Sequence, residues 1–209
     1  MDQMVSEEHR LLVFNGYKSR GKRHRVMNPA HLAELGHNGY YTSKSTFHVA
    51  AQGVDIRDSM IRVEIMVQAD GRVRVYDDHT HVELHFRKDR KVIRAEHLLS
   101  EAGINFSTGT GLDGSRWIRF DAPAGTCTKD LSRYWSATRD QLAVIVDEVL
   151  KWDGHEGYRS FYSSTDKAST DLVQYAFAAT GVRAGISSAG RQKGHHAEVL
   201  VVTPTRNEF

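Results

Sequence analysis

Two aspartates, Asp70 and Asp153, occupy the same place in two similar stretches of the sequence. Each ends a helix-length apolar run, at 59–69 and 141–152, and each is followed by glycine. Glycine readily adopts the left-handed conformation that closes a helix, so both acids are predicted at helix C-termini. Such an end carries about half a negative charge, and two carboxylates brought together there repel each other. A divalent cation, Mg²⁺, would compensate this charge and could activate water for phosphodiester cleavage.

The elements that must position these acids form an internal repeat. In each half, an apolar run with helical spacing is followed by strand-like residues, a second helix and further strand-like residues. Thr138 and Gln141 have the spacing of a helix N-terminal capping box, and Asp58 is the candidate cap of the first helix. The predicted second helices and closing strands are 89–102 and 116–120 in the first half, and 166–180 and 197–202 in the second.

With two Asp-Gly motifs opening matching halves, the sequence resembles the LAGLIDADG homing endonucleases found in inteins and introns, over roughly residues 56 to 204. The resemblance implies an α/β (α+β) fold of two pseudo-symmetric αββαββ halves that form a DNA-binding saddle, with the motif helices side by side. It also implies that the last acid of each motif, Asp70 or Asp153, is catalytic and binds divalent metal. Ala69 and Trp152, directly before the acids, complete the candidate metal-binding set.

The helix bodies depart from the family, whose small residues are here Glu64 and Ile65, then Asp147 and Glu148. The leading interpretation is a metal-dependent, site-specific double-stranded DNA endonuclease of a mobile genetic element, acting as a monomer with internal pseudo-twofold symmetry. One alternative is a non-cleaving DNA- or RNA-binding relative, such as a maturase or regulator, and another is the remnant of a broken intein. Both acids favour the enzyme, and the altered helix bodies favour the binder.

Basic residues on the predicted hairpins are the candidate DNA contacts. Alternate residues of a strand share one face, so Arg72 and Arg74 should point together towards base edges, with a turn near Asp77-Asp78. Arg87 or Lys88 is the candidate for positioning water, with Ser164 or Thr165 in the other half. The candidate contacts are Arg72, Arg74, Arg87, Lys88, Arg116, Arg119, Arg159, Arg183, Arg191 and Lys193, and in the first half Arg90, Lys91 and Arg94 extend the basic face.

Residues 1–55 lie outside the repeat and are predicted to form a small β-rich appendage. The stretch 5–13 resembles a block of the intein splicing (Hint) domain, with Ser6 and His9 at its Thr and His positions. Neither splicing junction is present, so no self-splicing is expected. The segment 17–25 contains five basic residues and no acid, which suits either phosphate binding or a solvated turn; these residues are Lys18, Arg20, Lys22, Arg23 and Arg25.

The predicted organisation is an appendage at 1–55, a first repeat at 56–122, a linker at 123–137 and a second repeat at 138–209. Tyr134 and Trp135 are expected to anchor the end of the linker in the core. The 209-residue chain has a net charge of +2 and a single cysteine, Cys127, which excludes an internal disulfide. Without an apolar run long enough for a membrane span, and without a signal-peptide core, the protein is expected in the cytoplasm at DNA, with no membrane partner.

Overall fold

The computed structural model describes residues 11–15, 24–27, 40–42, 49, 51–152, 154–155, 161–190 and 198–204. The chain forms two compact units, Met1–Phe47 and His48–Phe209. The first unit contains an antiparallel sheet in the order β2-β1-β3, which agrees with the β-rich character predicted for this part of the chain. Its strands are β1 Leu11–Asn15, β2 His24–Met27 and β3 Tyr40–Thr42.

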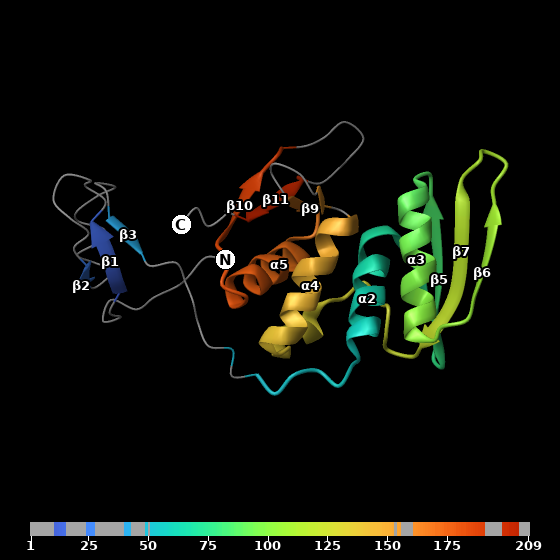
Figure 1. Ribbon diagram of the computed structural model, residues 1–209, viewed down its shortest axis with the longest axis horizontal. Coiled ribbons are helices and arrows are strands. Elements are labelled where there is room, and N and C mark those ends of the chain that lie inside the picture. The colour runs from blue at the N-terminus through green and yellow to red at the C-terminus, as the bar shows by residue number, and fades with distance from the viewer. Residues whose placement is uncertain are drawn as a thin grey trace. The chain divides into compact units, whose positions relative to one another are not determined.

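The second unit uses the order helix, two strands, helix, two strands twice (Figure 1). The first half comprises α2 Asp58–Asp70, β4 Gly71–Val75, β5 His79–Phe86, α3 Asp89–Ala102, β6 Phe106–Thr110 and β7 Arg116–Pro123. A short 3-10 helix, η1 Ser132–Ser136, precedes the second half. That half comprises α4 Arg139–Trp152, β8 Gly154–His155, β9 Phe161–Ser164, α5 Lys167–Ala179, β10 Ala184–Ser188 and β11 Leu200–Pro204.

Each half builds one four-stranded antiparallel sheet with the same strand order. The first sheet is β4-β5-β7-β6, and the second is β8-β9-β11-β10. Corresponding strands therefore occupy corresponding positions, which is what a repeated αββαββ unit requires. The predicted α/β fold of two such halves is confirmed.

Helices α2 and α4 pack against each other, and α3 and α5 pack against α2 and α4 respectively (Figure 1). The apolar residues predicted from helical spacing lie in this core. Met60, Val63 and Met66 of α2 are buried, as are Leu142 and Ile145 of α4. The two motif helices are thus adjacent, as the repeat predicted, and the apolar runs make their contact surface.

The end of α2 differs from the prediction in its backbone conformation. Asp70 is the last residue of the helix, as expected, but Gly71 has φ −78° and ψ 140°, which is extended and not left-handed. Glycine is required there for another reason: a Cβ on Gly71 would lie 2.6 Å from the carbonyl oxygen of Val67. The predicted helix end at Asp70 is therefore correct, but the predicted left-handed conformation of Gly71 is wrong.

Of the two predicted helix N-terminal caps, the one at α4 is correct and the one at α2 is wrong. At α4 the capping box is present, because Thr138 N donates to Gln141 Oε1 at 3.1 Å and Gln141 N donates to Thr138 Oγ1 at 3.3 Å. At α2 the cap position is held by Arg57, and Asp58 is already the first helical residue without a capping side-chain bond. The assignment of Asp58 as the cap was wrong.

A segment that precedes α2 in sequence is bonded to the second half. Gly53 N donates to Ser136 O at 3.0 Å. Val54 N donates to Gln141 Oε1 at 3.0 Å, and Gln141 Nε2 donates back to Val54 O at 2.8 Å. The amide of Gln141 therefore serves both its own helix start and a distant piece of backbone.

Of the two linker aromatic residues that were expected in the core, one is buried and one is exposed. Tyr134 is completely buried, whereas Trp135 is 43% exposed and lies against Tyr175. The prediction was correct for Tyr134 and wrong for Trp135. Among the described residues no helix has both the length and the apolar character needed to cross a membrane.

Candidate functional site

The first predicted acid, Asp70, is engaged by a lysine of the neighbouring helix. Lys91 of α3 donates from Nζ to Asp70 Oδ2 at 2.5 Å. Both side chains are largely enclosed, with Lys91 14% and Asp70 23% exposed. A second contact places Lys91 Nζ 5.8 Å from the ring centroid of Trp152, the last residue of α4. Lys91 thus touches the C-terminal ends of both motif helices.

The end of α4 receives two further cations from the same side of α3. Arg90 Nη1 donates to the carbonyl oxygen of Lys151 at 3.0 Å. Arg94 donates from Nε to Glu148 Oε1 at 2.7 Å, and its Nη2 donates to Glu148 Oε2. These three residues of the predicted basic face, Arg90, Lys91 and Arg94, are therefore engaged within the protein. In the sequence, Arg94 is four residues after Arg90 and three after Lys91, and both spacings make Arg94 a helix-surface neighbour of each.

The described residues do not fit a divalent metal ion at Asp70. One carboxylate oxygen already accepts a hydrogen bond from an ammonium, and no group of three His, Cys, Asp or Glu side chains lies close enough together in the described part of the chain. The other predicted acid, Asp153, lies outside the described residues. Of the remaining predicted ligands, Trp152 is buried against Glu148 and Ala69 is partly buried.

Charged residues join the two motif helices, and two of them, Asp147 and Glu148, lie at positions where small residues were expected from the resembled family. Arg62 Nη1 of α2 donates to Glu148 Oε2 at 2.8 Å and to Asp147 Oδ2 at 2.5 Å. Burial would raise the pKa of the Glu148 carboxyl, but hydrogen bonds from Arg94, Arg62 and Trp152 outweigh it and hold that pKa below its ordinary value. A buried but fully hydrogen-bonded carboxylate therefore lies between the two motif helices.

Glu64 forms a second buried polar cluster beneath α2. Tyr134 Oη donates to Glu64 Oε2 at 2.6 Å, and Cys127 N donates to Glu64 Oε1 at 3.1 Å. Burial, with the nearby Glu64 charge, raises the pKa of the Cys127 thiol to about 12, so this cysteine is a protonated packing residue at neutral pH. The cluster attaches the linker between the halves to the first motif helix.

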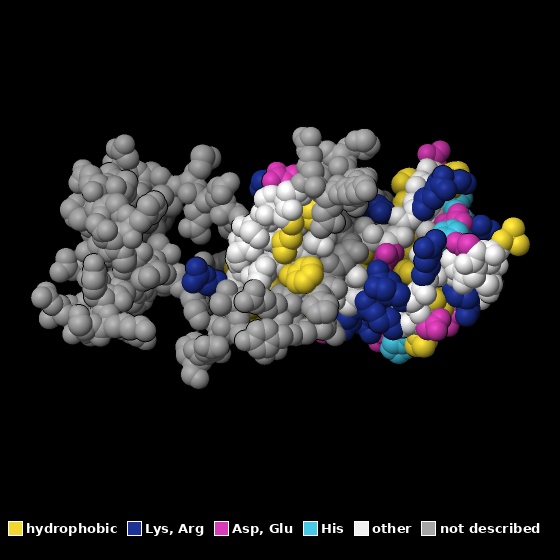
Figure 2. Space-filling view, turned by 90° about the horizontal axis from the view of Figure 1, so that it is seen from above, with side chains coloured by type: hydrophobic (Ala, Val, Ile, Leu, Met, Phe, Trp, Pro, Cys, Tyr) yellow, Lys and Arg dark blue, Asp and Glu magenta, His cyan; other side chains and the backbone are white. Residues whose placement is uncertain are grey.

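The sheet of the first half has one face covered by helices and one face open. Val82 and Leu84 of β5 are buried on the covered side. On the open side, the register aligns Arg72 with Glu83 and Glu83 with Arg119 across three neighbouring strands. Arg74 aligns with His81 and Asp121 in the next row. Figure 2 shows Lys and Arg side chains, with His and acidic ones among them, over the part of the molecule that holds this sheet and α3.

Ion pairs moderate the charge of this open face. Arg119 Nη2 donates to Glu83 Oε1 at 2.9 Å and lies 4.7 Å from the ring of Trp117. Hydrogen bonds from His85 and Arg119 lower the pKa of Glu83 to about 2, so it is ionised at all physiological pH. Within the described part of the chain, Arg72 and Arg74 are exposed and form no ion pair, so they supply the free positive charge.

The other predicted contacts are dispersed. Arg116 lies on the helix side of β7, 3.8 Å from Glu96 of α3, while Arg87 is 85% exposed near Asp113. Lys88 and Arg183 are exposed. Ser164 accepts a hydrogen bond from Asp166 N at the start of α5, and Thr165 is exposed. The remaining predicted residues, or their side chains, lie outside the described part: Ser6, His9, Lys18, Arg20, Lys22, Arg23, Arg25, Arg159, Arg191 and Lys193.

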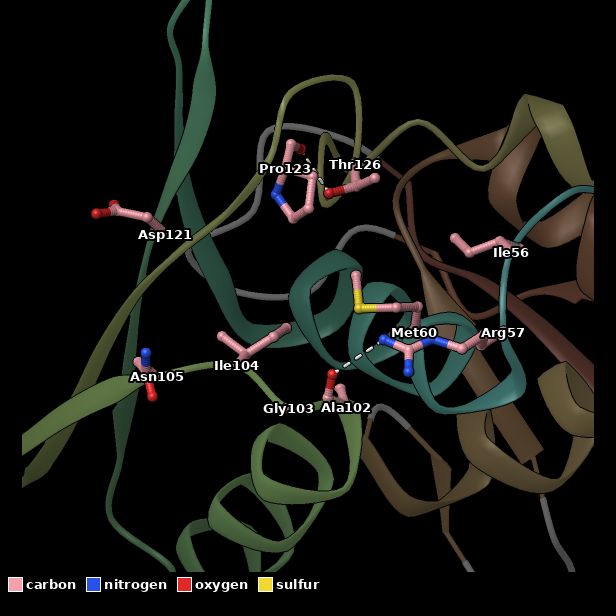
Figure 3. Close-up of a pocket in the computed structure, with 10 residues that line it drawn as sticks. All are labelled: Ile56, Arg57, Met60, Ala102, Gly103, Ile104, Asn105, Asp121, Pro123 and Thr126. Carbon is pink, nitrogen blue, oxygen red and sulfur yellow. Dashed lines mark hydrogen bonds between the residues drawn. The ribbon is translucent and has the colours of Figure 1, made fainter.

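A hollow of about 530 Å³ lies at the opposite end of α2 from Asp70 (Figure 3). It is bordered by Met60, Ile104 and Pro123, and Arg57 Nη2 donates to the carbonyl oxygen of Ala102 at 3.3 Å beside it. Its polar groups do not converge on one point, because the only described acid at its border, Asp121, points away from it (Figure 3). The hollow is therefore separate from the helix ends and has no arrangement suited to catalysis.

No family model matches the chain, and no curated protein matches it. Among solved structures, a mesophilic variant of the homing endonuclease I-DmoI is similar, with a TM-score of 0.52 and 13% identity, covering 71% of this chain and 90% of that one. I-DmoI in complex with DNA and Ca has a TM-score of 0.51 and 14% identity, covering 72% and 85%. Full-length DUF199/WhiA from Thermatoga maritima has a TM-score of 0.47 and 12% identity, covering 76% and 57%.

The likeness to I-DmoI and the repeated αββαββ order define the LAGLIDADG fold for this chain. At such low identity the likeness concerns the fold, and the function has to be argued from the residues of this protein.

Proposed function

We propose that the protein binds double-stranded DNA through the open face of the β4-β5-β7-β6 sheet. The observation that carries the proposal is the exposure of Arg72 and Arg74 on β4, on the same open face as Arg119, which is aligned with Arg72 through Glu83 of the strand between them. A ribbon of antiparallel strands fits the major groove, where arginine can bind guanine edges or the phosphates beside them. I-DmoI, which has the same fold, has been solved with DNA.

Histidines and carboxylates on the same face would restrain this charge. His81 Nδ1 lies 2.7 Å from Asp121 Oδ1, and His85 Nε2 lies 2.7 Å from Glu83 Oε1. A face of mixed sign binds phosphate less strongly than a uniformly basic one, and it offers both donors and acceptors to base edges. Such a surface suits recognition of a particular sequence more than non-specific coating of DNA.

The test is a DNA-binding titration with the full chain. Duplexes selected from a randomised library are titrated by fluorescence anisotropy at several salt concentrations, with EDTA present. Replacing Arg72 and Arg74 with Gln should weaken binding and reduce the slope of log affinity against log salt by about 1.8, because each lost phosphate contact contributes about 0.9. The control is the double change Arg139→Gln and Lys167→Gln, which alters net charge equally on α4 and α5. Failure of the wild type to bind any duplex would refute the proposal.

Metal-dependent DNA cleavage is the second candidate, and the position of Asp70 favours it. The acid ends α2, α2 packs against α4, and the described chain of α4 ends one residue before Asp153. In this candidate the protein is an intracellular monomer whose halves are related by a pseudo-twofold axis, and Mg²⁺ would bind Asp70 only after displacing Lys91. The test is the recovery of cut sites from a randomised DNA library by the wild type and by Asp70→Asn and Asp153→Asn. Equal cutting by either variant would show that these acids are not the catalytic ones.

A further inference from the structure

The first turns of α3 supply positive charge to the ends of both motif helices. Lys91 contacts Asp70 at the end of α2, and Arg90 donates to the Lys151 carbonyl at the end of α4. The last carbonyls of a helix have no partner within the helix and carry partial negative charge. The negative charge that two adjoining helix ends create is therefore compensated by side chains of this chain.

Lys91 is held as a component of the structure and not as a solvated surface lysine. Its side chain is only 14% exposed, its ammonium is 2.5 Å from Asp70 Oδ2, and the face of Trp152 lies 5.8 Å away. An ammonium near an aromatic face is stabilised by the ring quadrupole, the more so where water is excluded. Moving Lys91 away from Asp70 would give up both contacts.

We propose that Lys91 occupies the cation position at the end of α2, so that Asp70 does not bind a divalent metal ion in this protein. A metal ion such as Mg²⁺ needs its oxygen ligands at about 2.0–2.1 Å and prefers a full octahedral set. Asp70 Oδ2 already accepts a hydrogen bond from the Lys91 ammonium, so an ion bound there would have to compete with that contact. An ion placed there would also meet the fixed ammonium charge at short range in a partly dehydrated site, where like charges repel strongly. The metal role that the family resemblance implies for Asp70 is thus taken over by a residue of α3.

The three basic residues of α3 also link the two motif helices to each other. Arg90, Lys91 and Arg94 bind three different groups, at the ends of α2 and α4 and at the Glu148 carboxylate. Through them α3 holds the two motif helices together, which a metal ion does only while it is bound. The relation between the helix ends is then independent of metal concentration.

The test measures metal binding directly and without DNA. Mn²⁺ is titrated into the full chain and its free concentration is followed by electron paramagnetic resonance. The wild type should show no binding at the α2 end, so Asp70→Asn should leave its Mn²⁺ isotherm unchanged. Lys91→Met keeps the length and the apolar stem of the side chain but removes the charge, and should bind Mn²⁺ at least tenfold more tightly than the wild type. Adding Asp70→Asn to Lys91→Met should abolish that gain.

The matched control is Lys167→Met, which removes another lysine paired with a carboxylate, here Asp171 at 2.7 Å on α5. It should leave Mn²⁺ binding as in the wild type. Stoichiometric Mn²⁺ binding by the wild type that Asp70→Asn removes would overturn the proposal, as would a Lys91→Met protein that binds no more tightly than the control. If Lys91→Met does not fold, the wild type and Asp70→Asn isotherms alone decide between the two outcomes. Because no DNA is present, failure here is distinguishable from failure of the proposed DNA binding.

Discussion

The guanidinium of Arg62 on α2 donates to the carboxylate of Glu148 on α4 at 2.8 Å. This pair crosses the contact between the motif helices, and the Glu148 side chain has no exposed surface. Here the helices are joined by a buried charge pair that Arg94 and Trp152 complete. The stability of the interface should therefore depend on this charge pair as well as on apolar packing.

Removing Glu148 should destabilise the fold strongly. Glu148→Ala leaves Arg62 and Arg94 without their buried partner, which typically costs about 3–5 kcal/mol in the free energy of unfolding. The neighbouring Asp147 shares Arg62 as a partner but is 51% exposed, so Asp147→Ala should cost less than about 1 kcal/mol. Urea denaturation measures the free energy of unfolding of both variants. Equal losses of stability in the two would contradict the expectation that the buried acid contributes more than the exposed one.

Stability should fall in acid because of the same carboxylate. The pKa of Glu148 is lower in the folded protein than its ordinary value of 4.5. Its stabilising contribution is therefore complete at pH values above 4.5 and is lost as the pH falls through the lower, folded-state pKa. Melting temperatures measured from pH 6 to pH 3 should drop less steeply in Glu148→Gln than in the wild type. Parallel curves would show that other carboxyls determine the acid response.

The turn after Asp70 should tolerate no side chain. Gly71→Ala would place a Cβ 2.6 Å from the Val67 carbonyl oxygen and force the backbone to move. Overpacking of this kind costs about 1–3 kcal/mol, which should be seen as a lower melting temperature. Gly185→Ala on β10 is the comparison, because its Cβ would meet nothing within 4 Å. An unchanged melting temperature for Gly71→Ala would show that the backbone at residue 71 can accommodate a Cβ without loss of stability.

The two faces of β7 should differ in their effect on DNA binding. Arg119 lies on the open face, but Arg116 lies on the helix side near Glu96. We expect Arg119→Gln to weaken binding and Arg116→Gln to leave the affinity and its salt dependence unchanged. Anisotropy titrations with one selected duplex measure both. A loss for Arg116→Gln as large as that for Arg119→Gln would argue against the open face as the DNA surface.

Tyr134 should matter through its hydroxyl group. Tyr134→Phe keeps the ring in the core but removes the hydrogen bond to Glu64 Oε2, leaving that buried acceptor less well satisfied. The expected cost is about 1–3 kcal/mol in urea denaturation. Tyr76→Phe, at a tyrosine 47% exposed in the β4–β5 turn, is the control and should change little. Similar costs for both would indicate that Glu64 finds another partner.

Local sequence patterns predicted the bounds of the helices more accurately than the side-chain contacts between them. The helix Asp89–Ala102 has the predicted bounds because its amphipathic pattern ends at Gly103, which has the left-handed φ of 72° that closes a helix. The end of α2 at Asp70 was also predicted. Alternation along β7 places Arg116 and Arg119 on opposite faces, so the prediction of Arg116 as a DNA contact was not consistent with that of Arg119.

The pairing of Lys91 with Asp70 could not be predicted in the same way. It joins residues 21 positions apart and depends on how α3 crosses the end of α2. Acids on adjoining helix ends need a positive charge beside them, and an ammonium supplies that charge as well as a metal ion does. Only the packing of α3 against α2 shows that the cation beside Asp70 is a lysine and not a metal ion.

The bonds between Val54 and Gln141 have a consequence for how the chain could be divided. The second half forms hydrogen bonds with backbone of a segment that lies before the first half, so the covalent linker through Tyr134 is not the sole connection between the halves. A chain cut in the linker would yield a second-half fragment whose α4 start lacks its external partner, while the first-half fragment carries that partner as a free arm. The two fragments should therefore complement each other when mixed.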